Sequence, residues 1–65
     1  MKHYVLFDGR YTNDPDSAIV YDVCDTLEEA QESKRESFTD AVIVEETVEE
    51  FDVNQYRVLE STVIN

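Results

Sequence analysis

Three short runs of this chain carry apolar residues at consecutive positions, and this pattern limits the possible folds more than any other feature. The runs are His3-Tyr4-Val5-Leu6-Phe7-Asp8, Ala18 to Cys24 and Ala41 to Glu46. β-Branched and aromatic residues of this kind favour strands. A strand with one wet face alternates apolar and polar residues, whereas these runs place apolar side chains on both faces of a sheet.

The residues between the runs predict a turn, a loop and one helix. Asp8-Gly9 predicts a turn after the first strand. Arg10 to Ser17 holds the only proline and predicts a surface loop that joins two strands as a long hairpin. Asp25-Thr26-Leu27-Glu28-Glu29 predicts a helix start. Either Asp25 caps it, with Glu28 bonding back, or Thr26 does, with Glu29 in that role.

The helix is expected to run to about Phe38, with Leu27, Ala30, Lys34 and Phe38 on its inner face. The third strand can extend through Phe51, a turn follows at Asp52 to Asn54, and a fourth strand is expected from Gln55 to Ile64. The chain is therefore predicted to be a single α+β domain, residues 1–65. We expect a four-stranded, mainly antiparallel sheet with one helix packed on one face, in the order ββαββ.

One helix covers one face of such a sheet, so the other apolar face needs its own cover. Contiguous exposed apolar patches above a few hundred Å² are rare on monomers. A second copy or a different protein would provide the cover. Alternatively, the curl of the sheet and the loop over residues 9–17 would shelter it. The alternation does not choose which face the helix takes.

The small size of the chain limits its stability, and its cysteine content indicates the cellular compartment. A 65-residue chain buries only about 60% of the surface that its unfolded form exposes. One cysteine, Cys24, and one histidine, His3, cannot build an internal disulfide or a structural zinc site, and such domains are often helped by oligomerisation. The single thiol and an opening Met1-Lys2-His3 that leads directly into a strand predict a cytoplasmic protein.

Charge bounds the possible partners. Sixteen Asp and Glu residues stand against five Lys and Arg, and no cation occurs between Arg35 and Arg57. A net charge of −11 opposes binding to anionic membrane surfaces and to nucleic-acid phosphates. No apolar run approaches the roughly 20 residues of a transmembrane helix. We therefore expect a protein partner with a basic surface, no direct nucleic acid and no membrane.

The spacing of the acidic residues suggests how such a partner would be bound. Glu28, Glu32 and Glu36 recur every fourth residue and would form a file on one helix face. Alternate strand positions such as Glu46, Val48 and Glu50 would point outward roughly 6.6 Å apart. Both spacings are comparable to that of successive phosphates along one strand, so the surface could occupy a basic groove made for DNA or RNA. The partner-binding candidates are Glu28, Glu32, Glu36, Glu45, Glu46, Glu49 and Glu50.

Two other interpretations account for the acidity. Carboxylates solvate any exposed face, and lysine-poor acidic chains are also selected by a cytoplasm of high salt concentration. In both cases the protein would be a structural or oligomeric domain without inhibitory activity. The composition is similar in style to that of small proteins encoded by phages and mobile elements, and no motif supports the transfer of a site.

Catalysis and cofactors find little support in the residues. Cys24 precedes the predicted helix, where the helix dipole favours a thiolate, but Asp22 and Asp25 oppose it and a free cysteine is usually a small core residue. Asn13-Asp14-Pro15-Asp16-Ser17 offers oxygens to a cation such as Ca²⁺, yet matches no EF-hand loop and suits turns around a proline. We expect no enzyme activity, no catalytic residues, no metal and no cofactor.

Overall fold

Four strands and one helix form the described part of the protein, which a computed structural model defines for residues 1–9, 19–52 and 55–64. Along the chain they are β1 (Lys2–Phe7), β2 (Val20–Cys24), α1 (Leu27–Glu36), β3 (Val42–Asp52) and β4 (Gln55–Val63). The order confirms the predicted ββαββ arrangement and the α+β class. The predicted loop at 10–17 lies outside the described residues.

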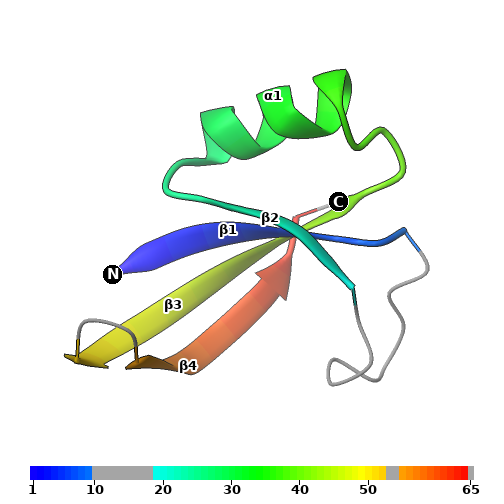
Figure 1. The fold of residues 1–65 in the computed structure, drawn as a ribbon. Helices are drawn as coiled ribbons and strands as arrows, with labels where there is room; N and C mark the ends of the chain where they lie inside the picture. The colour runs from blue at the N-terminus through cyan, green and yellow to red at the C-terminus, as the bar shows by residue number, and fades with distance from the viewer. Residues whose placement is uncertain (10–18, 53–54, 65) are drawn as a thin grey trace.

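The strands form one antiparallel sheet in the order β2-β1-β3-β4 (Figure 1). In β1, Val5 lies opposite Val23 of β2 on one side and Val44 of β3 on the other. β1 and β3 therefore occupy the centre of the sheet, while β2 and β4 are its edges.

The helix begins where the Thr26 alternative placed it. The Thr26 side chain accepts a hydrogen bond from the backbone N–H of Glu29 at 3.2 Å, so Thr26 and not Asp25 is the N-cap. The helix ends at Glu36 with Ser37 as its C-cap, slightly before the predicted end. At ten residues α1 is too short to span a bilayer, and the described part of the chain holds no longer helix.

The helix covers the sheet face that carries Leu6 and Ile43, both with no exposed surface. Cys24, Ala30 and Ala41 complete this buried cluster. Partly buried side chains surround it, namely Tyr4, Tyr21, Leu27 and Phe38. The rings of Tyr21 and Phe38 stack with their centroids 4.8 Å apart, so Phe38 closes the core although it follows the helix. This settles which face the helix takes.

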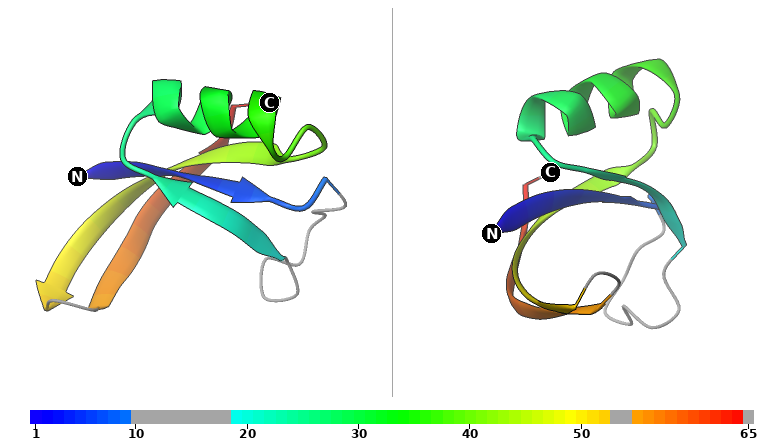
Figure 2. Two further views of the ribbon diagram at one scale, coloured as in Figure 1. Left: turned by 45° about the horizontal axis from the view of Figure 1, so that its top comes forward. Right: turned by 60° about the vertical axis from the view of Figure 1, so that its left-hand side comes forward.

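The opposite face is buried at its centre within the single chain. Val5, Phe7 and Val44 form a second buried cluster there, and Val48 is also buried. The sheet is strongly curled, with the β3–β4 hairpin bending beneath β1 (Figure 2). Two irregularities in β3–β4 pairing, at Thr47/Val48 and between Glu50 and Asp52, are bulges of the kind that bend and twist strands.

The centre of this face therefore does not need a second protein to cover it, unlike the more open face that the sequence suggested. The exposed apolar side chains that share this face lie at the sheet edges. They are Val20 and Val23 in β2, and Tyr56, Val58 and Val63 in β4.

Gly9 lies in the turn predicted after β1, where the backbone of Asp40 comes too close to leave room for a side chain. A Cβ atom built on Gly9 would clash with the backbone carbonyl oxygen of Asp40. No residue in the described part of the chain has a positive φ, so the glycine is needed for space and not for a left-handed conformation.

Candidate interaction surface

The three helix glutamates form an exposed file on the side of α1 that faces away from the sheet. Ala30 is buried and Leu27 is half-buried against the core, whereas Glu28, Glu32 and Glu36 are exposed. Side chains four residues apart on a helix lie roughly 6 Å from each other. Within the described part of the chain, no ion pair engages these three carboxylates.

The four glutamates of β3 divide between the two faces of the sheet. Glu45, opposite Tyr4, and Glu49, opposite Arg57, point to the same face as Ile43. The helix covers this face at Ile43. Glu46 lies opposite His3 on the curled inner face, and Glu50 shares that face. The strand therefore presents two carboxylates to each side, and the helix file is the larger group pointing in one direction.

Three of these four β3 carboxylates have partners within the chain. Lys2 Nζ lies 3.4 Å from Glu45 Oε1, and the Tyr4 hydroxyl donates to Glu45 Oε2 at 3.1 Å. This hydrogen bond, followed by burial, raises the pKa of Tyr4 above its ordinary value of 10.0. Arg57 Nη2 lies 2.6 Å from Glu49 Oε2 on the exposed side of the β3–β4 hairpin.

The partner of Glu46 is His3, and this pair is less exposed than Lys2–Glu45 or Arg57–Glu49. His3 Nε2 lies 2.6 Å from Glu46 Oε1, and only 13% and 14% of the two side chains are exposed. The ring of Tyr56 meets the His3 ring edge-to-face, with centroids 5.2 Å apart. His3 thus links β1 to β3 and β4, and these contacts hold the curl of the hairpin.

The row of Glu46, Val48 and Glu50 is not the outward row that strand alternation predicted. The three residues share a face, as predicted, but Val48 is buried and Glu46 is half-buried. The curl of the sheet turns this face inward, so only Glu50 of the three is exposed. Alternation fixes which residues share a face and says nothing about whether that face meets water.

Cys24 belongs to the core beneath the helix. Its exposed fraction is 7%, and its Sγ lies 3.6 Å from Asp22 Oδ2, which also accepts a hydrogen bond from the Ser33 hydroxyl at 3.0 Å. Burial, and then the Asp22 charge, raise the pKa of the Cys24 thiol above its ordinary value of 9.0. The Asp22–Ser33 hydrogen bond ties β2 to α1.

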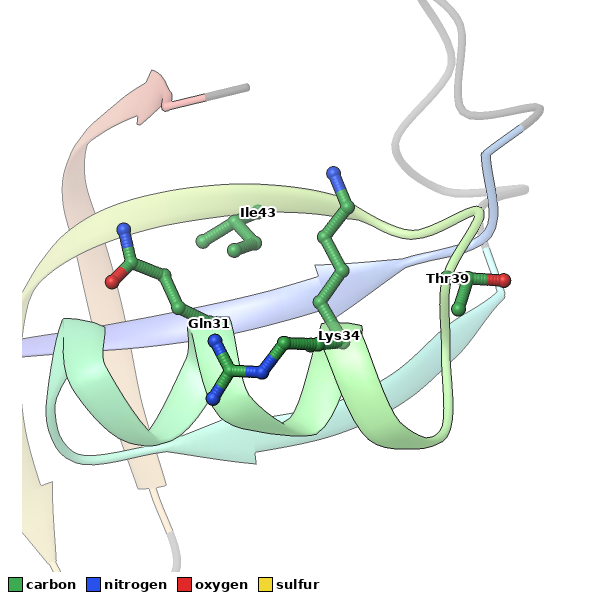
Figure 3. A pocket seen from close by; sticks show the side chains of 5 residues that line it. Gln31, Lys34, Thr39 and Ile43 are labelled. Atoms are coloured by element: carbon green, nitrogen blue, oxygen red, sulfur yellow. The ribbon is translucent and has the colours of Figure 1, made fainter.

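A pocket of about 310 Å³ lies between α1 and the start of β3. Its described lining is Gln31, Lys34, Arg35, Thr39 and Ile43 (Figure 3). These residues provide two cations and two neutral polar groups, without a carboxylate, an imidazole or a thiol. Lys34 and Arg35 lie in the last turn of α1, where cations interact favourably with the helix dipole.

Metal ligands do not converge in the described residues. No three His, Cys, Asp or Glu side chains among them are placed to hold a metal ion together. The oxygen-rich segment Asn13 to Ser17, considered above for a cation, lies outside the described part of the chain.

The partners of the β3 glutamates are what the sequence reading missed. Lys2 and His3 are more than 40 residues from Glu45 and Glu46 in the sequence, and β1–β3 pairing brings them together. For Arg57 a signal was present, since the turn predicted from Asp52 to Asn54 would place Arg57 opposite Glu49, where the strand pairing has it.

Comparison with known proteins yields no match to any family model, curated protein or solved structure.

Proposed function

We propose that this chain is a small acidic binding protein that acts by protein–protein contact and uses the file of Glu28, Glu32 and Glu36 to dock on a basic surface. The observation that carries the proposal is that these carboxylates are exposed on one side of α1 without an ion pair in the described structure. Glu45, Glu46 and Glu49 have partners within the chain, so they contribute less to an outward field.

The proposed partner is a nucleic-acid-handling protein whose groove accepts successive phosphates. A basic groove attracts successive phosphates electrostatically, and a file of carboxylates at helical spacing offers negative charge without the backbone of DNA. The protein would compete with nucleic acid for that groove and so act as an inhibitor or modulator. The helix fixes the backbone that carries the file, which limits the backbone entropy lost on binding.

Displacement of DNA tests this proposal. Fluorescently labelled duplex DNA is bound to each of several purified, sequence-nonspecific DNA-binding proteins, and the acidic chain is added while anisotropy is recorded. Rising salt screens the attraction between the carboxylates and a basic groove, and it weakens DNA binding as well, so a reference titration with DNA alone is run at each salt concentration. We expect displacement at low salt that is lost at moderate salt.

A matched pair of variants locates the surface. The triple variant Glu28→Gln, Glu32→Gln, Glu36→Gln is expected to lose most of the displacement and to flatten its salt dependence. The control Glu49→Gln, Glu50→Gln, Glu60→Gln changes the net charge equally, on the β3–β4 hairpin, and is expected to retain most of the activity. Equal losses in both variants would show that only total charge matters and would refute the file.

The alternative, an oligomeric domain whose acidity serves solubility, is favoured by one specific observation. Edge strand β4 is exposed along its whole length. An inert acidic domain would displace no DNA from any basic protein, and its acidic variants would differ from the parent only in solubility.

A further inference from the structure

β4 is an open edge strand with an unusual amount of exposed apolar surface. It ends the sheet, and all nine of its residues are exposed. Tyr56, Val58, Leu59 and Val63 are among them, with 42–56% of each exposed. Exposed edge strands carry unpaired backbone groups that pair readily with another strand, and natural proteins usually protect them with Lys or Pro, which β4 lacks.

The charge of β4 differs from that of the rest of the chain. Its one cation, Arg57, balances its one anion, Glu60, so that fifteen of the sixteen acidic residues lie outside it. Two molecules that each carry a net charge of −11 repel each other over most of their surfaces. An edge strand without net charge lets two copies approach with the least repulsion.

A bulge makes this strand complementary to itself. Thr47 pairs with Glu60 and Val48 pairs with Val58, which leaves Leu59 as the extra residue. Val58 and Leu59 together therefore fill one pairing position, and Arg57 and Glu60 lie one position to either side of it. Arg57 and Glu60 also share a sheet face, because their partners Glu49 and Thr47 are two residues apart in β3.

We propose that two copies of this chain associate through antiparallel β4–β4 pairing, with a two-fold axis at the Val58–Leu59 position. A two-fold axis perpendicular to an antiparallel pair maps one pairing position onto itself. Arg57 of each copy then lies opposite Glu60 of the other, while it keeps its contact with Glu49. The exposed side chains of Val58 and Leu59 meet across the axis.

The dimer would have a single continuous sheet, with four strands from each copy. The axis is perpendicular to the sheet, so both α1 helices lie on the same side. The proposal does not rest on the file of helix glutamates, and the triple variant Glu28→Gln, Glu32→Gln, Glu36→Gln is expected to dimerise like the parent chain.

Complementary charge variants test the register. Arg57→Glu alone places four glutamates at the junction and Glu60→Arg alone places four arginines there, so each is expected to weaken the homodimer by about tenfold or more. An equimolar mixture of the two restores both opposite-charge pairs, and it is expected to form a heterodimer close to parental affinity. Sedimentation velocity measures all three samples, and circular dichroism checks that each variant is folded.

A valine-to-lysine pair compares the two edges of the sheet. Val58→Lys in β4 is expected to abolish the dimer, whereas Val23→Lys, at an exposed position of the opposite edge strand β2, is expected to leave it intact. Both changes replace an exposed valine of an edge strand by a cation. The comparison therefore remains decisive even if Arg57→Glu, which also loses the contact with Glu49, does not fold.

Salt gives an independent check, since screening strengthens a contact between two acidic copies. The dimer of the parent chain is expected to tighten as NaCl rises from about 50 to about 500 mM. A parent chain that is monomeric at high concentration in about 500 mM NaCl would overturn the proposal, as would a mixture no tighter than its components. Loss of the dimer in Val23→Lys would overturn it too. If the parent chain is monomeric and its Val58→Lys variant no longer displaces DNA, the dimer is refuted and β4 instead contacts a different protein.

Discussion

The surroundings of each carboxylate decide what it does, although all the glutamates in this chain share one chemistry. Glu46 is partly buried and is held by His3, Glu49 is bound by Arg57 at the surface, and Glu32 faces water on the helix. Exposed ion pairs contribute typically 0–1 kcal/mol, and a partly buried, charge-assisted hydrogen bond contributes roughly 1.5–3 kcal/mol. Glu46 is therefore a structural residue, and Glu32 remains available to a partner.

The Cys24 thiol gives the residue-scale prediction. Its pKa is higher in the folded protein than in the unfolded chain, because it is buried near Asp22. The stability that the neutral thiol contributes is therefore intact below the ordinary pKa of 9.0 and is lost as pH rises through the folded pKa. Replacement by alanine removes this term and leaves the other titrating groups in place.

We expect Cys24→Ala to cost about 1–2 kcal/mol of unfolding free energy near neutral pH, because buried volume is lost. The difference from the parent chain should shrink as the pH rises from about 9 towards 10. Urea titrations of both proteins across this range measure it. Iodoacetamide should also modify the folded protein far more slowly than the urea-unfolded chain. A difference independent of pH, with fast alkylation of the folded protein, would place the thiol outside the core.

At the scale of one element, the cap of α1 separates two readings that the sequence left open. Thr26 accepts from the Glu29 N–H, whereas no hydrogen bond of this kind is made by Asp25 in the described structure. Thr26→Ala is expected to destabilise the protein by about 1 kcal/mol, and Asp25→Ala by only a few tenths, from lost interaction with the helix dipole. Chemical denaturation of the two variants measures the difference, and the reverse order would make Asp25 the cap.

The elements themselves were predictable from the sequence because their signals are local. Strand runs, the Asp25–Glu29 start signal and the turn at residues 52–54 place four strands and one helix close to their observed bounds. The pairing of Lys2 and His3 with Glu45 and Glu46 depends on contacts between distant segments, which local patterns do not record. The helix face and the curl were unpredictable for a related reason, since β1 is apolar on both sides and the bulges depend on strand pairing.

The same distinction applies to the candidate surface. Helical spacing predicted that Glu28, Glu32 and Glu36 share a face, and the backbone of a helix makes that inference secure. In β3 the alternation predicted correctly that Glu46 and Glu50 share a face, but their exposure depends on how the whole sheet bends. The bulge at Leu59, on which the proposed dimer depends, has no sequence signal that we recognise.

For the molecule as a whole, one net charge acts on three equilibria. Salt screens repulsion within the folded chain and between two copies, and it also screens attraction to a basic partner. It should therefore strengthen the fold and the β4 dimer while it weakens DNA displacement. If salt strengthened DNA displacement along with the fold and the dimer, the proposal of a basic partner would be contradicted. If salt weakened all three, the proposed dimer would be contradicted.

The stability of the fold against salt gives the last prediction. Each like-charge pair four residues apart on a helix costs about 0.2–0.5 kcal/mol, and the file of Glu28, Glu32 and Glu36 contains two such pairs. The chain should be folded in dilute buffer, where the His3–Glu46 contact and the buried clusters persist, and NaCl should add about 1 kcal/mol of unfolding free energy. Urea titration of the parent chain at low protein concentration, where a dimer dissociates, measures this gain. The triple glutamine variant should gain less from salt, since its file is already neutral. A chain that folds only at molar salt would instead show that its acidity is an adaptation to a saline interior.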